Sequence, residues 1–223
     1  MTNKVWVSWS SGKDSAFALN ELMKLGKFEV TKLVTTINET FERVAMHSVR
    51  ETLLIRQAEE LKLPLHRIKL PHPCSNEIYE SCMGEALNEA KRNDVSYMMF
   101  GDLFLEDIRQ YRIKMLEGAG ITPLFPIWKR PTAILAQEMI ASGFKAVITC
   151  VDPKKLSPSF AGRKFDESFL KDLPKGIDPC GENGEFHTFV YDAPIFEKPI
   201  NVEVGEIVER EGFIFADVYA KEP

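Results

Sequence analysis

The sequence lacks the features that mark several large classes of protein. No apolar run approaches the roughly twenty residues of a membrane-spanning helix, and the start of the chain carries neither a signal-peptide core nor a lipidation motif. The formal net charge is -5, with 28 Lys and Arg against 33 Asp and Glu, so a broadly basic surface for nucleic acid is missing. We therefore expect a cytoplasmic protein without a membrane partner, for which nucleic acid is a disfavoured partner.

Cysteine is scarce and shows no paired motif. The chain has four cysteines and no C-x-x-C pair: Cys74, Cys82, Cys150 and Cys180. In a reducing compartment we expect free thiols. His66 and His72 lie close to the first two cysteines, but the spacing fits no standard zinc pattern, so a zinc site is the disfavoured interpretation.

The sequence does contain a regular alternation of apolar segments. Of its 223 residues, 44% are hydrophobic and 27% are charged, as in an ordinary globular protein. Short apolar runs predict strands over residues 5–7, 28–37, 63–70, 97–100, 122–124 and 146–151. Apolar residues three and four apart predict helices over residues 14–25, 49–61, 76–90, 105–117 and 132–141. This order indicates an α/β fold with a parallel sheet and helices on both faces, because each parallel step needs a crossover.

In such sheets, ligands bind at the carboxyl ends of the strands. Those ends are expected at residues 8–12, 35–39, 101–104 and 149–153.

The pattern changes after Val151. Residues 152–180 are interrupted by proline and glycine, with one expected helix over residues 168–173. From residue 186 apolar and polar residues alternate, and a turn at Glu211-Gly212 separates two further strands, which is typical of antiparallel β structure. We predict two domains, residues 1–151 and residues 152–223, the second a smaller α+β domain that folds over the mouth of the parallel sheet.

Residues 5–16 form the strongest candidate for a binding site. A strand ends there and a helix begins near Asp14, so several backbone N–H groups lack helical partners and the helix dipole is positive. Lys13 adds a full positive charge, and three serines add hydroxyl donors. These features favour an anion such as phosphate. Neither G-x-x-x-x-G-K-[ST] nor G-x-G-x-x-G is present, and a serine-rich turn in which Asp14 only caps the helix is the alternative.

This turn resembles the S-G-G-x-D-S motif of the PP-loop ATP pyrophosphatases. It consists of Ser10, Ser11, Gly12, Lys13, Asp14 and Ser15. Ser11 stands where the motif has its first glycine. Members of the superfamily cleave ATP between the α and β phosphates and transfer adenylate to an acceptor. The resemblance implies that the six residues bind ATP, that Lys13 is a mobile point charge on the phosphates, and that Asp14 holds Mg²⁺.

Four later segments resemble the branch of this superfamily that contains diphthine–ammonia ligase. They are GDLFLED at residues 101–107, PIW at 126–128, SFAGR at 159–163 and GENGEFHT at 181–188. The resemblance implies a Rossmann-like ATP-binding domain of the adenine nucleotide alpha hydrolase (HUP) type and a substrate cleft beside a smaller C-terminal domain. It also implies a ligase that adenylates a carboxylate, releases AMP and pyrophosphate, and forms an amide with ammonia.

One position departs from the pattern of the diphthamide enzymes. They have G-E-F-E-T where this chain has GEFHT, with His187 in place of the second acid. The histidine form resembles a bacterial subgroup for which a part in cobalamin salvage has been suggested. An imidazole in place of a carboxylate lowers the attraction for a cationic trimethylammonium acceptor and raises it for an anionic one. The acceptor, a small-molecule or protein-borne carboxylate, therefore stays open.

The predicted site extends beyond the loop. The nucleotide side adds Thr35, Thr36, His47, Gly101 and Asp102, with the two threonines beside the adenine. The acceptor side comprises Glu106, Arg109, Arg163, Glu182, Glu185 and His187.

Glu185 is the predicted catalytic contact to the amine, and it shares a face with His187 if the segment is extended. A β-bulge with solvated carboxylates is the alternative. Asp102 and Glu106 also suit helix capping. We expect Arg112, three residues after Arg109, at the surface.

Two other functions stay open. Cys150 and Cys180 allow sulfur transfer to tRNA, which some PP-loop enzymes perform, although neither a paired cysteine motif nor a basic excess supports it. A nucleotide-binding protein without turnover is the second alternative. Residues 194–196, Pro-Ile-Phe, indicate either a homodimer contact or an edge strand buried within the chain.

Overall fold

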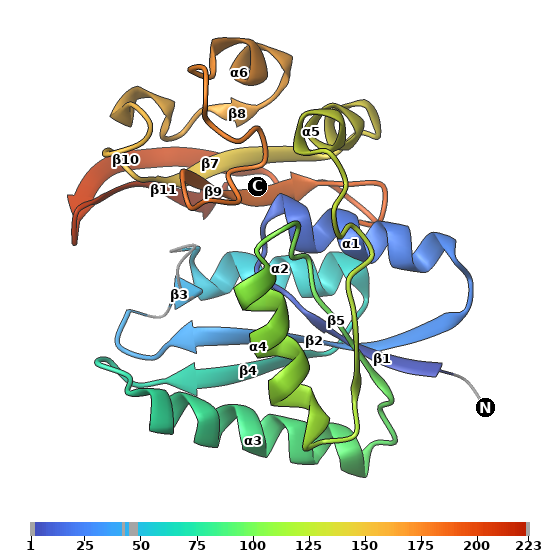
Figure 1. Ribbon diagram of the computed structural model, residues 1–223. Coiled ribbons are helices and arrows are strands. Elements are labelled where there is room, and N and C mark those ends of the chain that lie inside the picture. The colour runs from blue at the N-terminus through green and yellow to red at the C-terminus, as the bar shows by residue number, and fades with distance from the viewer. Residues whose placement is uncertain (1–2, 42, 45–48, 222–223) are drawn as a thin grey trace.

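The computed structural model describes residues 3–41, 43–44 and 49–221. Two β-sheets lie one above the other with a layer of helices between them (Figure 1). The helices are α1 (Lys13–Lys24) and α2 (Glu51–Leu61) between the sheets, α3 (Asn76–Arg92) and α4 (Glu106–Glu117) on the opposite side of the first sheet, and α5 (Thr132–Ala141) and α6 (Glu167–Asp172) beyond the second. The predicted Rossmann-like α/β fold with a smaller C-terminal α+β unit is thus confirmed.

The first sheet is parallel apart from one short strand. Its strands are β1 (Asn3–Ser8), β2 (Phe28–Asn38), β3 (Arg43–Val44), β4 (Leu65–Leu70), β5 (Tyr97–Met99) and β6 (Thr122–Leu124). β6, β5, β1 and β2 lie side by side, β4 pairs in parallel with β2, and β3 runs antiparallel to β2. β2 and β4 lie on one side of β1, and the chain then crosses over to add β5 and β6 on the other side. The carboxyl ends of β1 and β5 therefore flank the switch point where ligands bind in such sheets.

Successive residues of β1 face opposite layers of helices. Val5 and Val7 belong to the core shared with α1, α2 and the second sheet, whereas Trp6 packs among residues of α3 and α4. Each of the three is at most 2% exposed. Because a strand turns successive side chains to opposite faces, a strand this apolar needs cover on both sides.

The second sheet is antiparallel and contains the C-terminal strands. They are β7 (Lys145–Val151), β8 (Lys164–Phe165), β9 (Phe186–Asp192), β10 (Val202–Arg210) and β11 (Phe213–Ala220), with a 3-10 helix, η1 (Pro158–Phe160), between β7 and β8. β7 pairs with β8, β9 and β11, and β10 pairs with β11. Glu211 and Gly212, with φ of 51° and 80°, form the predicted turn between β10 and β11. Positive φ at both positions suits the twist of a two-residue hairpin.

One detail of the strand prediction is wrong. We predict residues 146–151 as a strand of the parallel sheet, but this strand, β7, pairs antiparallel with its neighbours in the second sheet. Its residues after Lys145 are all buried, and such an apolar run fits either sheet. The change of sheet falls before Lys145, whereas the domain boundary that we predict follows Val151. The second strand ends at Asn38, within the range that we expect for its carboxyl end.

Two of the α-helices begin at a residue whose side chain caps them, α3 at Ser75 and α6 at Asp166. Ser75 caps α3, and its hydroxyl accepts the backbone N–H of Ile78 over 3.3 Å.

Phe196 packs in the chain's own core and Pro194 is exposed, so a homodimer stays a prediction. Across the part of the chain that the structure describes, no helix has the length and apolar character to span a membrane.

Candidate functional site

The turn between β1 and α1 gathers hydroxyl groups at a helix N-terminus. The N-cap of α1 is Gly12, which offers no side chain to the helix end. The hydroxyls of Ser10 and Ser15 lie 3.0 Å apart, and Ser15 also donates to the carbonyl of Gly12 over 3.0 Å. The serines thus stand at the positive end of α1, where an anion is stabilised by the helix dipole. Ser11 adopts a φ of 67°, the left-handed conformation that favours glycine.

The end of β5 approaches this turn so closely that only glycine fits. A Cβ atom added to Gly101 would lie 2.7 Å from the backbone nitrogen of Ser15 and 2.8 Å from the carbonyl carbon of Asp14. Contacts this short do not occur between real Cβ atoms and backbone, so a side chain here would force the two segments apart. Gly101 therefore sets the spacing between the carboxyl end of β5 and the start of α1.

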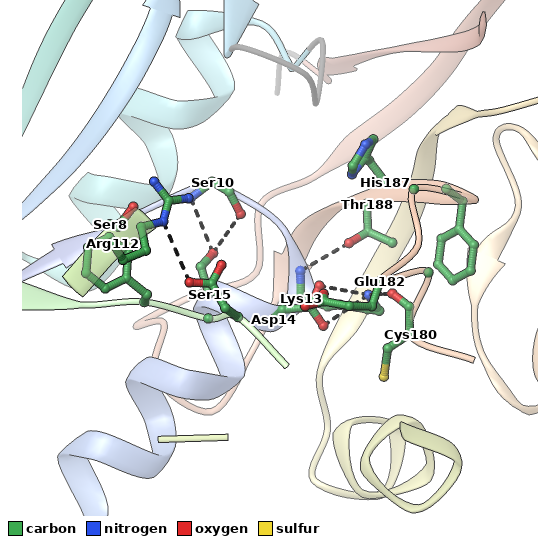
Figure 2. A pocket seen from close by; sticks show the side chains of 16 residues that line it. Ser8, Ser10, Lys13, Asp14, Ser15, Arg112, Cys180, Glu182, His187 and Thr188 are labelled. Carbon is green, nitrogen blue, oxygen red and sulfur yellow. Dashed lines mark hydrogen bonds and ion pairs between the residues drawn. The ribbon is translucent and has the colours of Figure 1, made fainter. Parts of the chain in front are cut away.

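A cavity of about 210 Å³ opens at this switch point. Its walls come from three parts of the chain: the turn after β1, the start of the β5–α4 segment with Arg112, and residues 180–188 of the C-terminal unit. In Figure 2, Arg112 lies on the side of Ser10 and Ser15, His187 and Thr188 lie on the opposite side, and Lys13 is between them. The site is therefore shared by both sheets.

Lys13 is 2% exposed and ties the turn to the C-terminal unit. Its ammonium donates to both carboxylate oxygens of Asp14, at 3.1 and 2.9 Å, and to the carbonyl of Cys180. The rings of Phe165 and Phe186 lie 5.5 and 5.3 Å from the nitrogen. Burial by itself lowers the pKa of Lys13, but Asp14, Cys180 and Glu182 together outweigh it, and the pKa lies above its ordinary value. The side chain is thus a cation held at the inner wall of the cavity.

Two further carboxyl groups share the cavity with Asp14. Burial raises the pKa of Asp102, although the guanidinium of Arg112 opposes the shift. Burial also raises the pKa of Glu182 to about 7, while the N–H of Leu103, which donates to this carboxylate over 2.8 Å, opposes the shift. The charge of Asp14 adds to both shifts. A cation placed among these groups would relieve their mutual repulsion.

His187 carries no charge near neutral pH. Burial and, to a smaller extent, the nearby ammonium of Lys13 lower its pKa to about 4. The positive charge that could attract an anionic acceptor is therefore absent from the neutral imidazole. Burial likewise raises the pKa of Cys150 to about 12 and that of Cys180 above its ordinary value. Both are buried thiols rather than reactive thiolates.

A second cavity, of about 360 Å³, adjoins the first through His187. It lies at the carboxyl ends of β2 and β4 and is closed by β7, β9 and the β10–β11 hairpin. Its lining among the described residues is mainly apolar, with the aromatic rings of Phe41, Phe213 and Phe215. Arg43 and Arg210 add cationic groups at its wall. The two cavities together form a divided site, polar on one side of His187 and mainly apolar on the other.

Eight of the seventeen predicted residues line the first cavity. Those that line it are Ser10, Lys13, Asp14, Ser15, Gly101, Asp102, Glu182 and His187. Ser11 and Gly12 belong to the same turn. His47 lies outside the described residues.

Five predicted residues contact other parts of the molecule. Thr35 is buried and donates its hydroxyl to the carbonyl of Trp9 over 2.7 Å, because β2 extends beyond it. Thr36 lines neither cavity. Glu106 is exposed and accepts from Gln110 over 2.7 Å. Arg163 pairs with Asp172 at 2.7 Å. The fifth residue, Arg109, packs on two aromatic rings.

Neither arginine of α4 lies where we expect it. Arg112, which we expect at the surface, lines the cavity with its Nε 3.7 Å from Asp102 and its guanidinium 4.9 Å from the ring of Phe100. Arg109 instead lies over the rings of Phe125 and Trp128, at 5.3 and 5.1 Å. The prediction for Arg112 is therefore wrong, since the aromatic surroundings of each arginine decide its direction.

Glu185 is 3% exposed and does not line the first cavity. Its Oε1 accepts the backbone N–H of Asp178 and the amide of Asn183, each over 3.1 Å. The carboxylate therefore organises the 178–185 loop. A role in deprotonating ammonium stays a prediction.

Several lining residues carry no strong sequence signal. They are Ser8, Phe100, Arg112, Cys180, Phe186 and Thr188. Phe186 and Thr188 lie within the GENGEFHT segment, which points to the region but not to the individual contacts.

The residues present fit a nucleoside triphosphate with a divalent cation. Hydroxyl and N–H donors at the start of α1 suit phosphate oxygens, and Mg²⁺ prefers one or two carboxylates together with such oxygens. Two buried atoms at the cavity, Asp102 Oδ2 and Arg112 Nε, face each other at 3.7 Å, which is too long for a hydrogen bond, and have no hydrogen-bond partner within the described structure; a ligand between them could satisfy both. Within the same residues, no group of three acidic, histidine or cysteine side chains is placed to hold a metal ion by itself, so phosphate oxygens would have to complete its coordination.

Comparison with known proteins covers both halves of the chain. The model of the diphthamide synthase N-terminal domain matches residues 3–122, and that of the diphthamide synthase C-terminal domain matches residues 131–220. The diphthine–ammonia ligase of Bos taurus is 28% identical over 231 residues, which span 94% of this chain and 86% of that protein. The enzyme of the same name from Rattus norvegicus is 30% identical over 177 residues, 72% of this chain and 66% of that protein.

A solved structure described as a predicted subunit of tRNA methyltransferase from Methanocaldococcus jannaschii is also similar. It covers 87% of this chain and 98% of its own, with a TM-score of 0.42 and 15% identity.

Proposed function

Because the chain belongs to the diphthamide synthase family, in the diphthine–ammonia ligase-like branch of the PP-loop ATP pyrophosphatases, we propose that it is an ATP-dependent ligase that joins ammonia to a carboxylate. ATP would be split into AMP and pyrophosphate. The observation that carries the proposal is the shared cavity. The hydroxyl groups of the turn before α1 and the carboxyl group of Glu182, from the C-terminal unit, line the same space. The curated relatives named diphthine–ammonia ligase support an amide-forming reaction.

The first step needs an anchored pyrophosphate and an exposed α phosphorus. The hydroxyls of Ser10 and Ser15 and the positive end of α1 hold the β and γ phosphates, and Arg112 faces the charge that grows on the leaving pyrophosphate. Asp14 and Asp102 would hold Mg²⁺, which neutralises phosphate charge when bound. The acceptor carboxylate then attacks the α phosphorus, the bond to the bridging oxygen breaks, and pyrophosphate leaves.

The second step places ammonia against the activated carboxylate. The nitrogen attacks the acyl carbon, the carbon–oxygen bond to AMP breaks, and one proton must leave the nitrogen. Glu182 lines the cavity and has a pKa raised to about 7, so it is suited to accept that proton near neutral pH. The acceptor body would enter from the second cavity, with His187 at the boundary between the two. Its identity stays open, because the neutral His187 selects neither a cation nor an anion by charge.

Phosphorus NMR tests the reaction directly. ATP, Mg²⁺, ammonium and a panel of carboxylates would be incubated with the parent chain and with Asp14→Ala. AMP and pyrophosphate are expected with the parent, and about 100-fold less with Asp14→Ala. Glu209→Ala, which removes an exposed acid from β10, is the matched control and should keep the parent rate.

ADP as the product would refute adenylate formation. ATP binding without any release of pyrophosphate would instead identify a nucleotide-binding protein without turnover.

A further inference from the structure

The side-chain amide of Gln57, on α2, is buried behind the serine turn without reaching the cavity. It is 0% exposed and does not line the first cavity. Its oxygen accepts the indole N–H of Trp9 over 2.8 Å. Its nitrogen donates to the carbonyls of Ser11 over 3.0 Å and Val190 over 2.6 Å. Only one orientation of the amide satisfies an N–H donor and two carbonyl acceptors, so the side chain is fixed on all sides.

Ser11 needs such support. Its φ of 67° lies in the left-handed region that favours glycine, and strained backbone persists where its surroundings fix it. The carbonyl of Ser11 accepts two hydrogen bonds, one from Gln57 and one from the backbone N–H of Val190 at 3.0 Å. The turn that faces the cavity is therefore held from behind by α2 and by β9.

We propose that Gln57 is a positioning residue that holds the phosphate-binding turn against β9. This inference rests on the proposed function of the turn as the nucleotide site. β9 also carries His187 and Thr188 on the opposite wall of the cavity. Gln57 thus links the geometry of the nucleotide side to that of the acceptor side, through one amide that bridges Ser11 and Val190.

A purely structural role predicts something different. If Gln57 only fills space between α2 and the second sheet, an apolar side chain of similar size should reduce stability without a specific effect on the cavity. If it positions Ser11, the same substitution should weaken nucleotide binding more than a core substitution of equal cost to folding.

Calorimetric titration with the non-hydrolysable α,β-methylene ATP and Mg²⁺ separates the two roles. Gln57→Leu should bind the analogue about tenfold or more weakly than the parent. Leu87→Ala, on α3 at the far face of the parallel sheet, is the control for lost stability and should keep the parent affinity. Unfolding in urea measures the stability of each variant.

Trp9→Phe provides a second test. It removes the N–H that orients the amide of Gln57, together with part of a buried ring, and it should weaken binding about threefold. Unchanged affinity in Gln57→Leu overturns the inference. If Gln57→Leu does not fold, unchanged affinity in Trp9→Phe overturns it. A parent chain that does not bind the analogue refutes the proposed function instead.

Discussion

The backbone N–H of Lys13 donates to the hydroxyl of Thr188 over 3.1 Å, although 175 residues separate the two in the sequence. Lys13 is the first residue of α1 and Thr188 lies on β9, so the bond joins the start of the phosphate-facing helix to the second sheet. Both residues are buried. The first sheet supplies the turn, and the second sheet fixes where it points.

Thr188→Val is expected to destabilise the fold. Valine keeps the shape of the side chain but leaves the buried N–H of Lys13 without an acceptor, which costs about 1–3 kcal/mol. Urea unfolding should show this loss, and Thr188→Ser, which keeps the hydroxyl, should recover most of it. Equal stability in the valine variant and the parent would contradict the importance of this bond.

Gly101→Ala should disrupt both folding and nucleotide binding. The added Cβ meets backbone atoms of Asp14 and Ser15 at 2.8 and 2.7 Å, and backbone cannot turn aside as a flexible side chain can. We expect a loss of about 1–3 kcal/mol together with weaker binding of α,β-methylene ATP. Gly118→Ala is the matched control, because Gly118 has helical φ of -63° and open space around it. That variant should be neutral or slightly stabilised.

The stability of Ser11 variants should depend on the backbone conformation at this position rather than on the loss of the side-chain hydroxyl. Ser11→Ala keeps the strained left-handed conformation and loses the hydroxyl bond to the carbonyl of Ser10. Ser11→Gly loses the same bond but relieves the strain. The glycine variant is therefore expected to be more stable than the alanine variant by about 1 kcal/mol. Thermal and urea unfolding of the two variants give the ranking, and the reverse order would show that the strain at Ser11 is negligible.

Much of the fold follows from local patterns in the sequence. The predicted boundaries of α5 match the observed helix, Thr132–Ala141, because three-and-four spacing and flanking breaks define a helix locally. The sheet to which β7 belongs could not be predicted from local patterns. Its apolar run shows that both faces are buried, but hydrogen-bond partners far along the chain decide between a parallel and an antiparallel neighbour.

The site, too, could be predicted only in part from the sequence. The serine turn and the GENGEFHT segment are visible as motifs, and their residues do share one cavity. The choice between Arg109 and Arg112 depends on which rings and acids surround each guanidinium, which no spacing along α4 reveals. Gln57 carries no motif either, and its partners lie 46 and 133 residues away on the turn and on β9.

The pH dependence of stability gives a last test, through Glu182. Its pKa rises from an ordinary 4.5 in the unfolded chain to about 7 in the folded one, so folding favours the protonated carboxyl. Its contribution to stability is fully present below pH 4.5 and is lost as the pH rises through about 7. Glu182→Gln cannot ionise, yet its amide oxygen can still accept the N–H of Leu103 that Glu182 accepts now.

The variant should therefore gain stability over the parent as the pH rises from 5 to 8. Urea unfolding of both chains at several pH values gives this difference, in which the other titrating groups, His187 included, largely cancel. A difference that stays constant across this range would show that Glu182 is ionised in the folded chain already at pH 5. In that case it could not take up a proton from ammonium near neutral pH, and another group would have to do so.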